Sequence, residues 1–575
     1  MQELLYQDLR AKSRTFFKKI VYFYFPAGKL RITTIIKRGE GAITSRIVSF
    51  FCAFVFALGL LGLKVMSLGK GDTVKDAATV QSSRTVTLSE GRAGIYDRNL
   101  SPLVNRETER KALIFPDLAD LNVLKEFAGD EGLVEAAKSS VPYVMDTDGK
   151  IIEGEGIYNF EAPVRYSKDQ LAVHIIGYMN DGSGASGIEH AYDEVLKAGA
   201  QKVTATYYAD GTGRLLTGED ISVTVPDNKS VRGVVLTLDS KIQRISEKAL
   251  AAGTEKGAAV VMDVENGEIL AAASVPVFDP LNLSASFKNE NAPFINRAFS
   301  SYTVGSTFKL VTAAAALEAG VSTGRTYDCK SSIEVEERIF KCHWEYGHGE
   351  IDMPAALRVS CNPYFIDLAM DIGGARILEM AKNLGFGSAA EFGPGFAPSA
   401  GKLPTEEEVS YKTSLASFAF GQGKLMATPV QMAALAAAIA NGGCAVTPSL
   451  VLGFYDEEGN FSETPRYESN RAMSEKTAAL LREMMIGVVE NGSGEAAKPE
   501  TGGAGGKTAS AQTGQFREDG SEIVHAWFVG FYPAENPKYA VAVLAEGMDS
   551  GGDFAAPIFK EICDGIVKTE EQDHF

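Results

Sequence analysis

The chain has 575 residues, 45% of them hydrophobic, which is enough for about three or four average globular domains. Its formal net charge of −18 argues against nucleic-acid binding, because a nucleic-acid-binding face is normally basic. The charge is also uneven along the chain. Residues 1–46 hold ten basic and three acidic side chains and carry +7, so the rest of the chain carries −25.

The first long element is the apolar segment at residues 47–68, IVSFFCAFVFALGLLGLKVMSL, whose only charge is Lys64. A helix of this length crosses a hydrocarbon core of roughly 30 Å, and the Lys64 side chain can extend to the interface. Basic flanks stay in the cytoplasm, so we expect residues 1–46 inside the cell and everything after residue 68 outside. A signal peptide is the competing interpretation, but its usual short basic region and A-x-A-like cleavage site are not apparent.

After the span, a polar stretch is expected to be a tether that lifts the external body off the bilayer. Beyond it, residues 94–104 read as a hairpin and residues 186–199 as a helix, with turn-rich segments following. No constellation of titratable side chains stands out before residue 230. We therefore expect residues 69–232 to be a linker and a non-catalytic pedestal domain.

A second domain is expected to begin at Gly233 and to run to residue 575. Its predicted elements are a strand at 233–239, a helix at 240–253 after an Asp/Ser cap, two strands joined at Asn266-Gly267, helices dominating 306–440, strands at 525–533 and 539–547, and a helix from about 555. Strands at both ends with helices between them predict an α+β fold in which a sheet is sandwiched by helices.

Cys329 and Cys342 are near each other in YDCKSSIEVEERIFKCHW and leave three interpretations open. The two residues could flank a hairpin and form a disulfide, which would stabilise the fold by about 3 kcal/mol in the chain-entropy model. An external location favours this disulfide. Free thiols, or a zinc site that includes His343 and His348, are the alternatives.

Ser306 and Lys309 are three positions apart where the apolar segment FKLVTAAAALEAG begins. An apolar surface all round predicts a buried helix, and the i, i+3 spacing puts the two side chains on one face. A buried ammonium costs free energy unless a neighbour needs a base or a charge. A serine hydroxyl needs such a base to become a nucleophile, so Lys309 is predicted to remove the Ser306 proton.

The segment VSCNPYF contributes Ser360 and Asn362 around Cys361. Ser360 offers a hydroxyl relay. Asn362 offers an amide donor and a carbonyl acceptor to a peptide substrate.

The segment GGKTASAQTG contributes Lys507, Thr508, Ala509 and Ser510. Lys507 would bias Lys309 toward its neutral form and attract an anionic substrate end, and Thr508 could bind a carboxylate. The strand beyond Thr508 could pair with an extended substrate, and a backbone N–H there could form an oxyanion hole with that of Ser306. Each triplet alone is common by chance. Their order, spacing and helix, loop and strand settings together indicate a serine acyl-transfer site.

With these three motifs the sequence closely resembles the penicillin-binding proteins, specifically the class B D,D-transpeptidases. The resemblance runs from about residue 47 to the C-terminus and includes GRAGIYDRN, SGIEHAYDEVL, LTLDSKIQ, VMDVENGEILAAASVP, NRAFSSYTVGSTFK, FGQGKLMATPVQMAALAAAIANGG and HAWFVGFYP. It implies a transpeptidase domain like that of penicillin-binding proteins and serine β-lactamases, on an elongated α+β pedestal, with one N-terminal transmembrane helix.

The resemblance implies that the substrate is a peptidoglycan stem peptide ending in D-Ala-D-Ala, that Ser306 attacks the penultimate D-Ala carbonyl, and that β-lactams mimic this substrate. It implies neither a metal nor an organic cofactor. The expected partner is a membrane glycan polymerase, docked through the transmembrane helix and the pedestal. A catalytically weak scaffold, a β-lactamase and a β-lactam sensor are the alternatives.

Two positions depart from the family pattern. Val304 stands where the family usually has proline, which should alter only the start of the helix. Ala509 replaces the glycine of K-T-G, and its methyl group could crowd an approaching substrate backbone. We therefore expect slower β-lactam acylation than in a glycine variant.

Overall fold

The computed structural model describes residues 18–25, 28–35, 42–69, 82–139, 141–200, 202–210, 215–216, 221–224, 231–456, 458–465 and 469–573. The chain divides into two compact units, Met1–Thr85 with Thr206–Ser222 and Val86–Ala205 with Val223–Phe575. The three motifs of the predicted active site all lie in the second unit. The first part of the predicted tether, residues 70–81, and much of the basic head lie outside the described residues. The later part is not the simple tether that was expected, because Ser83–Glu90 forms strand β3 of a three-stranded sheet.

The first unit contains the apolar helix α1 (Ala42–Gly69) and two paired antiparallel strands, β1 (Lys18–Phe25) and β2 (Gly28–Ile35). Within α1, Ser45–Ser67 has a mean hydropathy of 2.2 and is the one helix of the described residues that is long and apolar enough to cross a membrane. The side chains of Phe50 and Phe51 are 77% and 65% exposed, a surface that hydrocarbon would cover. The helix is consistent with a membrane anchor and agrees with the predicted span to within two residues.

The N-terminal part of the second unit is built on a three-stranded antiparallel sheet in the order β6-β5-β7. Its elements are β4 (Gly94–Tyr96), β5 (Glu107–Ile114), α3 (Leu121–Lys138), β6 (Tyr143–Asp146), β7 (Ile157–Val164), α4 (Val173–Ile176), α5 (Gly187–Ala191) and α6 (Asp193–Ala198). The predicted hairpin near residue 94 is confirmed by an antiparallel bridge between Tyr96 and Pro102. The single helix predicted at 186–199 is wrong, because Tyr192 leaves helical geometry and separates α5 from α6.

This region also holds a buried ion network, so the expectation that it lacks a constellation of titratable groups is wrong. Glu189 is fully buried, with Oε2 3.0 Å from Arg92 Nε and Oε1 2.6 Å from Arg165 Nε. Arg92 also pairs with Asp193 at 2.8 Å. Two guanidinium groups on one buried carboxylate compensate its desolvation. The network ties α5 and α6 to the strands beside them.

The predicted sandwiched sheet is a five-stranded antiparallel sheet in the order β14-β13-β25-β24-β23. Its strands are β13 (Gly257–Asp263), β14 (Ile269–Val275), β23 (Gly505–Phe516), β24 (Glu522–Tyr532) and β25 (Tyr539–Glu546). The predicted turn between β13 and β14 is confirmed, with Gly267 at φ 75°. All five strands bury alanine, and all but the edge strand β23 also bury valine, as expected of a sheet covered on both faces.

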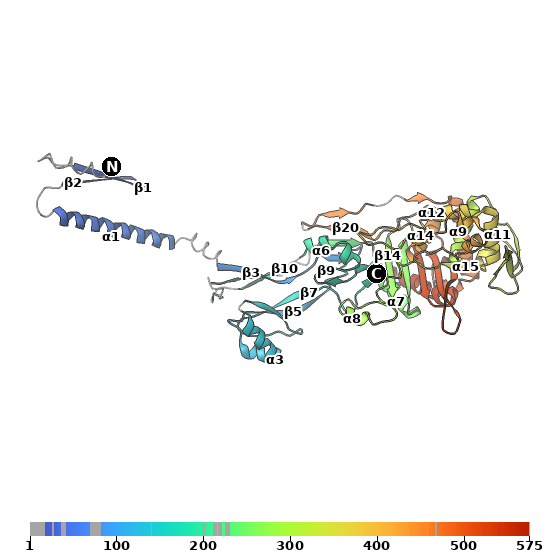
Figure 1. Cartoon of the computed structure of the whole chain (residues 1–575), viewed down its shortest axis with the longest axis horizontal. Helices are drawn as coiled ribbons and strands as arrows, with labels where there is room; N and C mark the ends of the chain where they lie inside the picture. The colour runs from blue at the N-terminus through green and yellow to red at the C-terminus, as the bar shows by residue number, and fades with distance from the viewer. Residues whose placement is uncertain are drawn as a thin grey trace. The chain divides into compact units, whose positions relative to one another are not determined.

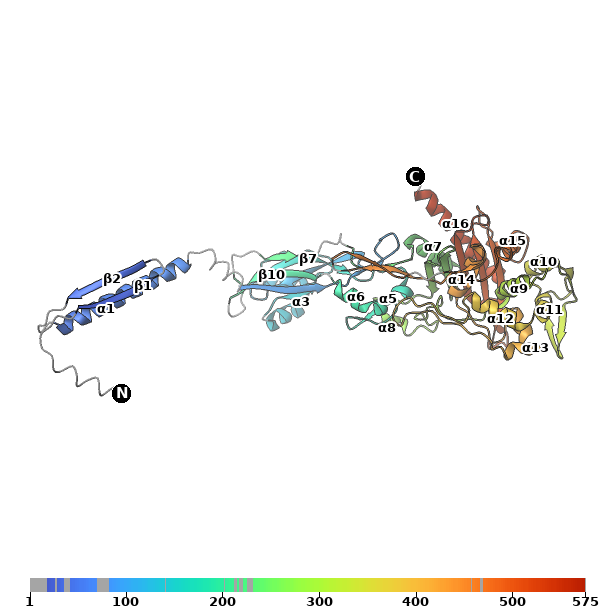
Figure 2. The same ribbon diagram turned by 90° about the horizontal axis from the view of Figure 1, so that it is seen from above.

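Alternate residues of β13 face opposite layers. Ala259 and Val261 pack in one core with α7 (Ser240–Gly253) and α16 (Ala556–Asp573), whereas Ala258 and Val260 pack in another with α14 (Pro429–Ala440) and α15 (Glu475–Asn491). Figure 2 shows α7 and α16 on one side of the sheet and α14 on the other. The predicted cap of α7 is also confirmed, because the Asp239 side chain accepts from the backbone N–H of Lys241 and Ile242.

The connection between β14 and α14 carries a helical group in which α9, α11 and α12 pack together (Figure 1). Its helices are α9 (Lys309–Glu318), α10 (Met353–Arg358), α11 (Asn362–Ile372), α12 (Gly374–Asn383) and α13 (Lys412–Ala419). Residues 327–351 interrupt these helices, and the hairpin expected between Cys329 and Cys342 is present. The segment forms two antiparallel strand pairs, β15 (Tyr327–Cys329) with β18 (Gly349–Ile351) and β16 (Ser332–Val335) with β17 (Arg338–Lys341).

A second sheet links the N-terminal part of the second unit to the part that holds the five-stranded sheet. Its order is β21-β20-β12-β4, with β12 at Gly233–Leu236, β20 at Val451–Tyr455 and β21 at Phe461–Glu463. Strand β12 pairs in parallel with β4. The predicted strand at Gly233 is therefore present, and it joins the pedestal region to the region of the five-stranded sheet.

Candidate active site

Ser306 lies in a 3₁₀ helix, η1 (Gly305–Phe308), and Lys309 begins α9 directly after it. The tighter 3₁₀ turn brings side chains at i and i+3 almost into register. Lys309 Nζ consequently lies 3.0 Å from Ser306 Oγ. The sequence correctly predicted a buried helix and a facing pair, but not that the serine would precede the α-helix on a tighter turn.

Glycines on both sides of the nucleophile allow close backbone approach. Gly305 has φ +54°, and a Cβ there would lie 3.0 Å from the Ala511 Cβ on β23. The Gly305 N–H donates to the Gly421 carbonyl at 3.0 Å, and a Cβ on Gly421 would lie only 2.0 Å from the Gly305 oxygen. Strand β23 and the FGQG loop thus fix the backbone that carries Ser306.

Lys309 is fully buried, and three neighbouring groups surround its amine besides Ser306. Nζ lies 2.7 Å from the Ser360 carbonyl oxygen, 2.7 Å from Asn362 Oδ1 and 3.2 Å from Ser360 Oγ. Asn362 Nδ2 donates to the Lys341 carbonyl at 3.3 Å, which turns Oδ1 toward the lysine. Burial lowers the pKa of Lys309 to about 7, against an opposing effect of the Cys361 and Cys342 thiols. The amine is therefore available as a base near neutral pH.

Lys507, which lies on β23, also contacts Ser360. Its Nζ lies 3.0 Å from Ser360 Oγ and 2.9 Å from the Thr508 carbonyl oxygen. Burial first, and then the nearby charge of Lys309, hold the pKa of Lys507 well below its usual value. The Ser360 hydroxyl bridges the two amines, so a proton can pass between them through it.

Ser360 has φ 56°, an uncommon conformation for a residue with a side chain. Residues are held in such conformations when the surroundings over-determine them, most often at functional sites. Here both the carbonyl and the hydroxyl of Ser360 contact Lys309. The strained turn places the carbonyl oxygen and Oγ of Ser360 in contact with Lys309 Nζ.

The three remaining predicted residues follow Lys507 on β23, the edge strand of the sheet. Thr508 is 6% exposed, and its Oγ1 lies 2.8 Å from Ser493 Oγ. Ser510 is exposed and lines the cavity in front of Ser306. Ala509 is 3% exposed, and its Cβ lies 3.4 Å from the position a Gly305 Cβ would occupy. Its methyl group therefore faces the residue before the nucleophile and not the cavity.

A cavity of about 650 Å³ opens in front of these groups. Ser306 and Asn362 line its floor, and Ser510, Gln512 and Thr513 of β23 line one side. Unpaired backbone groups on an edge strand can bind an extended chain. The cavity therefore combines a nucleophile with a surface for a peptide.

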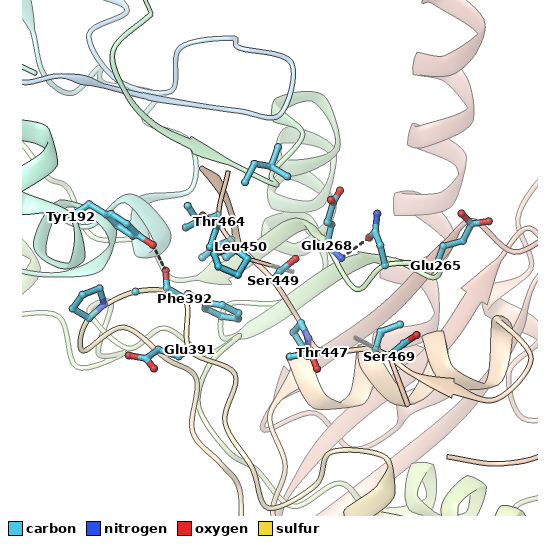
Figure 3. A pocket seen from close by; sticks show the side chains of 18 residues that line it. Tyr192, Glu265, Glu268, Glu391, Phe392, Thr447, Ser449, Leu450, Thr464 and Ser469 are labelled. Carbon is cyan, nitrogen blue, oxygen red and sulfur yellow. Dashed lines mark hydrogen bonds between the residues drawn. The ribbon is translucent and has the colours of Figure 1, made fainter. Parts of the chain in front are cut away.

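A second pocket of about 430 Å³ lies in the same unit, apart from these groups (Figure 3). Tyr192 donates to the Phe392 carbonyl at 3.1 Å on one side, and Glu268 and Ser449 line the other. Among the described residues that line it there is no lysine, histidine or cysteine. It has no counterpart of the serine–lysine pair.

Of the three interpretations of Cys329 and Cys342, the structure has the two residues as free thiols and not as the favoured disulfide. The two cysteines do lie close together, but Cys361 and His348 join them. Cys342 Sγ lies 3.5 Å from His348 Nδ1 and 3.9 Å from His343 Nδ1. The Cys342 thiol therefore has several partners besides Cys329.

Two groups of the site were missed from the sequence. Ser493, which contacts Thr508, comes from the loop after α15 and belongs to no recognisable motif. The Lys341 carbonyl, which orients Asn362, is a backbone group and carries no signal of residue type. The sequence predicted a carboxylate partner for Thr508 and gave no signal of its contact with Ser493.

Residues 257–564 match the family model for the penicillin-binding protein transpeptidase domain. The chain belongs to this family. It is a class B penicillin-binding protein and a serine-type D,D-transpeptidase. The predicted fold and reaction class are confirmed.

Three relatives illustrate the similarity. The chain is 29% identical to stage V sporulation protein D of Bacillus subtilis, over 90% of this chain and 84% of that protein. It is 30% identical to penicillin-binding protein PbpB of Mycolicibacterium smegmatis, over 78% of this chain and 71% of that protein. A solved structure of penicillin-binding protein A of M. tuberculosis, a ceftriaxone acyl-enzyme complex, has a TM-score of 0.58 and 26% identity, covering 71% of this chain and 93% of that one.

Proposed function

We propose that this transpeptidase cross-links peptidoglycan stem peptides ending in D-Ala-D-Ala, with Ser306 as nucleophile and Lys309 as its base. The observation that carries the proposal is the set of contacts around Lys309 Nζ. A neutral amine has two hydrogens, and the Ser360 carbonyl and Asn362 Oδ1 can accept both at 2.7 Å. Its lone pair then remains for the Ser306 hydroxyl at 3.0 Å.

In the acylation step the Ser306 proton moves to Lys309 Nζ as Oγ bonds to the penultimate D-Ala carbonyl carbon. The C–N bond to the terminal D-Ala then breaks, and the proton reaches the leaving amine directly or through the Ser360 hydroxyl. An amine of a neighbouring strand releases the acyl group by the reverse sequence. The backbone N–H groups of Ser306 and of β23 near Ser510 would stabilise the oxyanion.

Lys507 and Thr508 would bind the terminal carboxylate of the substrate. A carboxylate beside Lys507 favours the charged form of that amine. The added positive charge then favours the neutral form of Lys309. Substrate binding would thus prepare the base.

β-Lactams would acylate the same serine, and the ceftriaxone acyl-enzyme complex of the M. tuberculosis relative supports acylation by this class of drug. The test uses the full-length protein in detergent with a fluorescent penicillin, followed by mass spectrometry of the adduct. Ser306→Ala should abolish labelling, and Ser284→Ala, at an exposed serine, should not change it. An adduct on another residue would refute the assignment of Ser306.

The lifetime of the label separates the alternatives. A label that persists for many minutes supports a transpeptidase, and rapid loss indicates a β-lactamase. No Ser306-dependent label indicates a catalytically silent scaffold. The intact geometry of the Lys309 contacts favours the transpeptidase.

We take residues 69–232 as linker and pedestal and residues 233–575 as the catalytic domain, held outside the cell by α1. The basic residues before α1 support a cytoplasmic N-terminus. Helix α1 and the pedestal would be the docking surfaces for a membrane glycan polymerase. Protease added to intact spheroplasts should remove the catalytic domain and spare an epitope on residues 1–17. Destruction of that epitope would refute the orientation.

A further inference from the structure

Four metal-ligating side chains converge next to the catalytic residues. Cys329, Cys342, His348 and Cys361 each offer one ligand atom, and these four atoms all lie within 4.8 Å of one another. We propose that they form a structural zinc site. The proposal concerns a resident ion of the fold and does not depend on the proposed substrate.

One ligand–ligand distance in the cluster matches that around a single tetrahedral ion. Zinc–sulfur bonds of about 2.3 Å and zinc–nitrogen bonds of about 2.0–2.1 Å place tetrahedral ligand atoms roughly 3.6–3.8 Å apart. Cys342 Sγ and His348 Nδ1 lie 3.5 Å apart. Three thiolates and one imidazole make a closed ligand set typical of structural zinc. His343 is exposed and is not part of this set of four atoms.

The fold brings the four ligands together from segments that are separate in the sequence. Cys329 ends β15 and pairs with Gly349 of β18, so His348 comes directly before the paired strand. Gly347 passes so close that a Cβ there would lie 2.3 Å from the Cys329 carbonyl oxygen. The Cys342 N–H donates to the Ser331 carbonyl at 2.7 Å just after β17.

Burial also favours an ion over isolated thiols. Cys329, Cys342 and Cys361 are 2%, 8% and 0% exposed, and His348 is half-buried. A disulfide would use two of the thiols and leave the third thiol and the imidazole without a role. One zinc ion uses all four. On binding, the three thiols lose their protons to solvent and no electron is transferred.

The site is built into the catalytic loop. Cys361 lies between Ser360 and Asn362, both of which contact Lys309. Cys342 follows Lys341, whose carbonyl accepts from Asn362. Zinc would therefore hold the groups that orient Lys309, which makes the four ligands positioning residues for the proposed reaction.

Metal content tests the site directly. Full-length protein purified in detergent without chelator should contain about one zinc per chain by inductively coupled plasma mass spectrometry. X-ray absorption at the zinc edge should show three sulfur ligands and one nitrogen ligand. Cys329→Ser and His348→Ala should each lose most of the zinc, whereas Cys444→Ser, a cysteine outside the cluster, should retain it. Because the first two measurements use the unaltered chain, misfolding of a variant cannot decide the outcome.

Several results would overturn the proposal. In the metal analysis, these are a zinc content below about one ion per ten chains, or iron or copper in place of zinc. In the X-ray absorption spectrum, it is a different set of ligands. In mass spectrometry, it is a protein mass lower by two hydrogens that maps to a disulfide within the cluster. Zinc retained in a folded Cys329→Ser variant would also refute it.

The positioning role has a separate readout. Removing zinc with a strong chelator should slow penicillin acylation at least tenfold, and adding zinc back should restore it. An unchanged rate in zinc-free protein would refute the positioning role. Absence of any Ser306 label in zinc-loaded protein would refute the proposed function and leave the metal content as measured.

Discussion

The lowered pKa of Lys309 predicts how acylation depends on pH. A base must be neutral to take the Ser306 proton, so the rate follows the neutral fraction of Lys309. With a pKa of about 7, roughly one tenth of the lysine is neutral at pH 6 and roughly nine tenths at pH 8. Acylation should therefore rise about tenfold across this interval and then level off. A lysine at its usual pKa of about 10.5 would instead give rates that climb about tenfold per pH unit to about pH 10.

The groups around Lys309 define what the profile reports. Burial is the main cause of the lowered pKa, and the thiols of Cys361 and Cys342 act in the opposite direction. Lys507 is the other cation at the site, and its own pKa is lowered by burial and by Lys309. The position of the rising limb therefore reports mainly the burial of Lys309.

The assay is the second-order rate constant of acylation by a fluorescent penicillin, measured at fixed ionic strength with drug hydrolysis followed in parallel. Lys309→Met should slow acylation by about 10²–10⁴-fold at every pH. Lys476→Met, at an exposed lysine, should leave the profile unchanged. A rate that continues to climb beyond pH 9, or a Lys309→Met rate within a few-fold of wild type, would refute the role of Lys309 as the base.

Three further outcomes follow from the structure. Ser360→Ala removes the hydroxyl between the two lysines and should slow acylation about 100-fold or more with the protein still folded, as judged by thermal unfolding. Glu189→Ala leaves two arginines without their shared carboxylate and should destabilise the full chain by about 3–5 kcal/mol, measured against the exposed control Glu194→Ala. Ala509→Gly removes the methyl group next to the backbone that carries Ser306 and should speed penicillin acylation, and an unchanged rate would make that prediction wrong.

Periodicity and turn chemistry were sufficient to predict most of the sheet and its covering helices. The strands β13 and β14 and the helix α7 are local structures, specified by apolar runs, an Asn-Gly turn and an Asp cap. The break at Tyr192 was not predictable in this way. That residue leaves helical geometry where its hydroxyl reaches the carbonyl of Phe392, two hundred residues away.

The sequence predicted the part of the active site that is made of side chains, but not the part that is made of backbone groups. Ser306, Lys309 and Lys507 have functional groups that are visible in the sequence. The carbonyls of Ser360 and Lys341 do not, yet they orient the base and the amide beside it. The pairing of β15 with β18 was also missed, because these strands are too short for a period-two pattern to emerge.

The S-C-N tripeptide shows why a cysteine between two catalytic residues need not be catalytic. Ser360 at φ 56° turns the backbone, and Asn362 then begins α11. Ser360 and Asn362 contact Lys309, while the Cys361 thiol lies with Cys329, Cys342 and His348. The tripeptide thus belongs at once to the acyl-transfer site and to the thiol cluster. Any change that tightens or releases the cluster must therefore move the carbonyl and amide oxygens that hold the base.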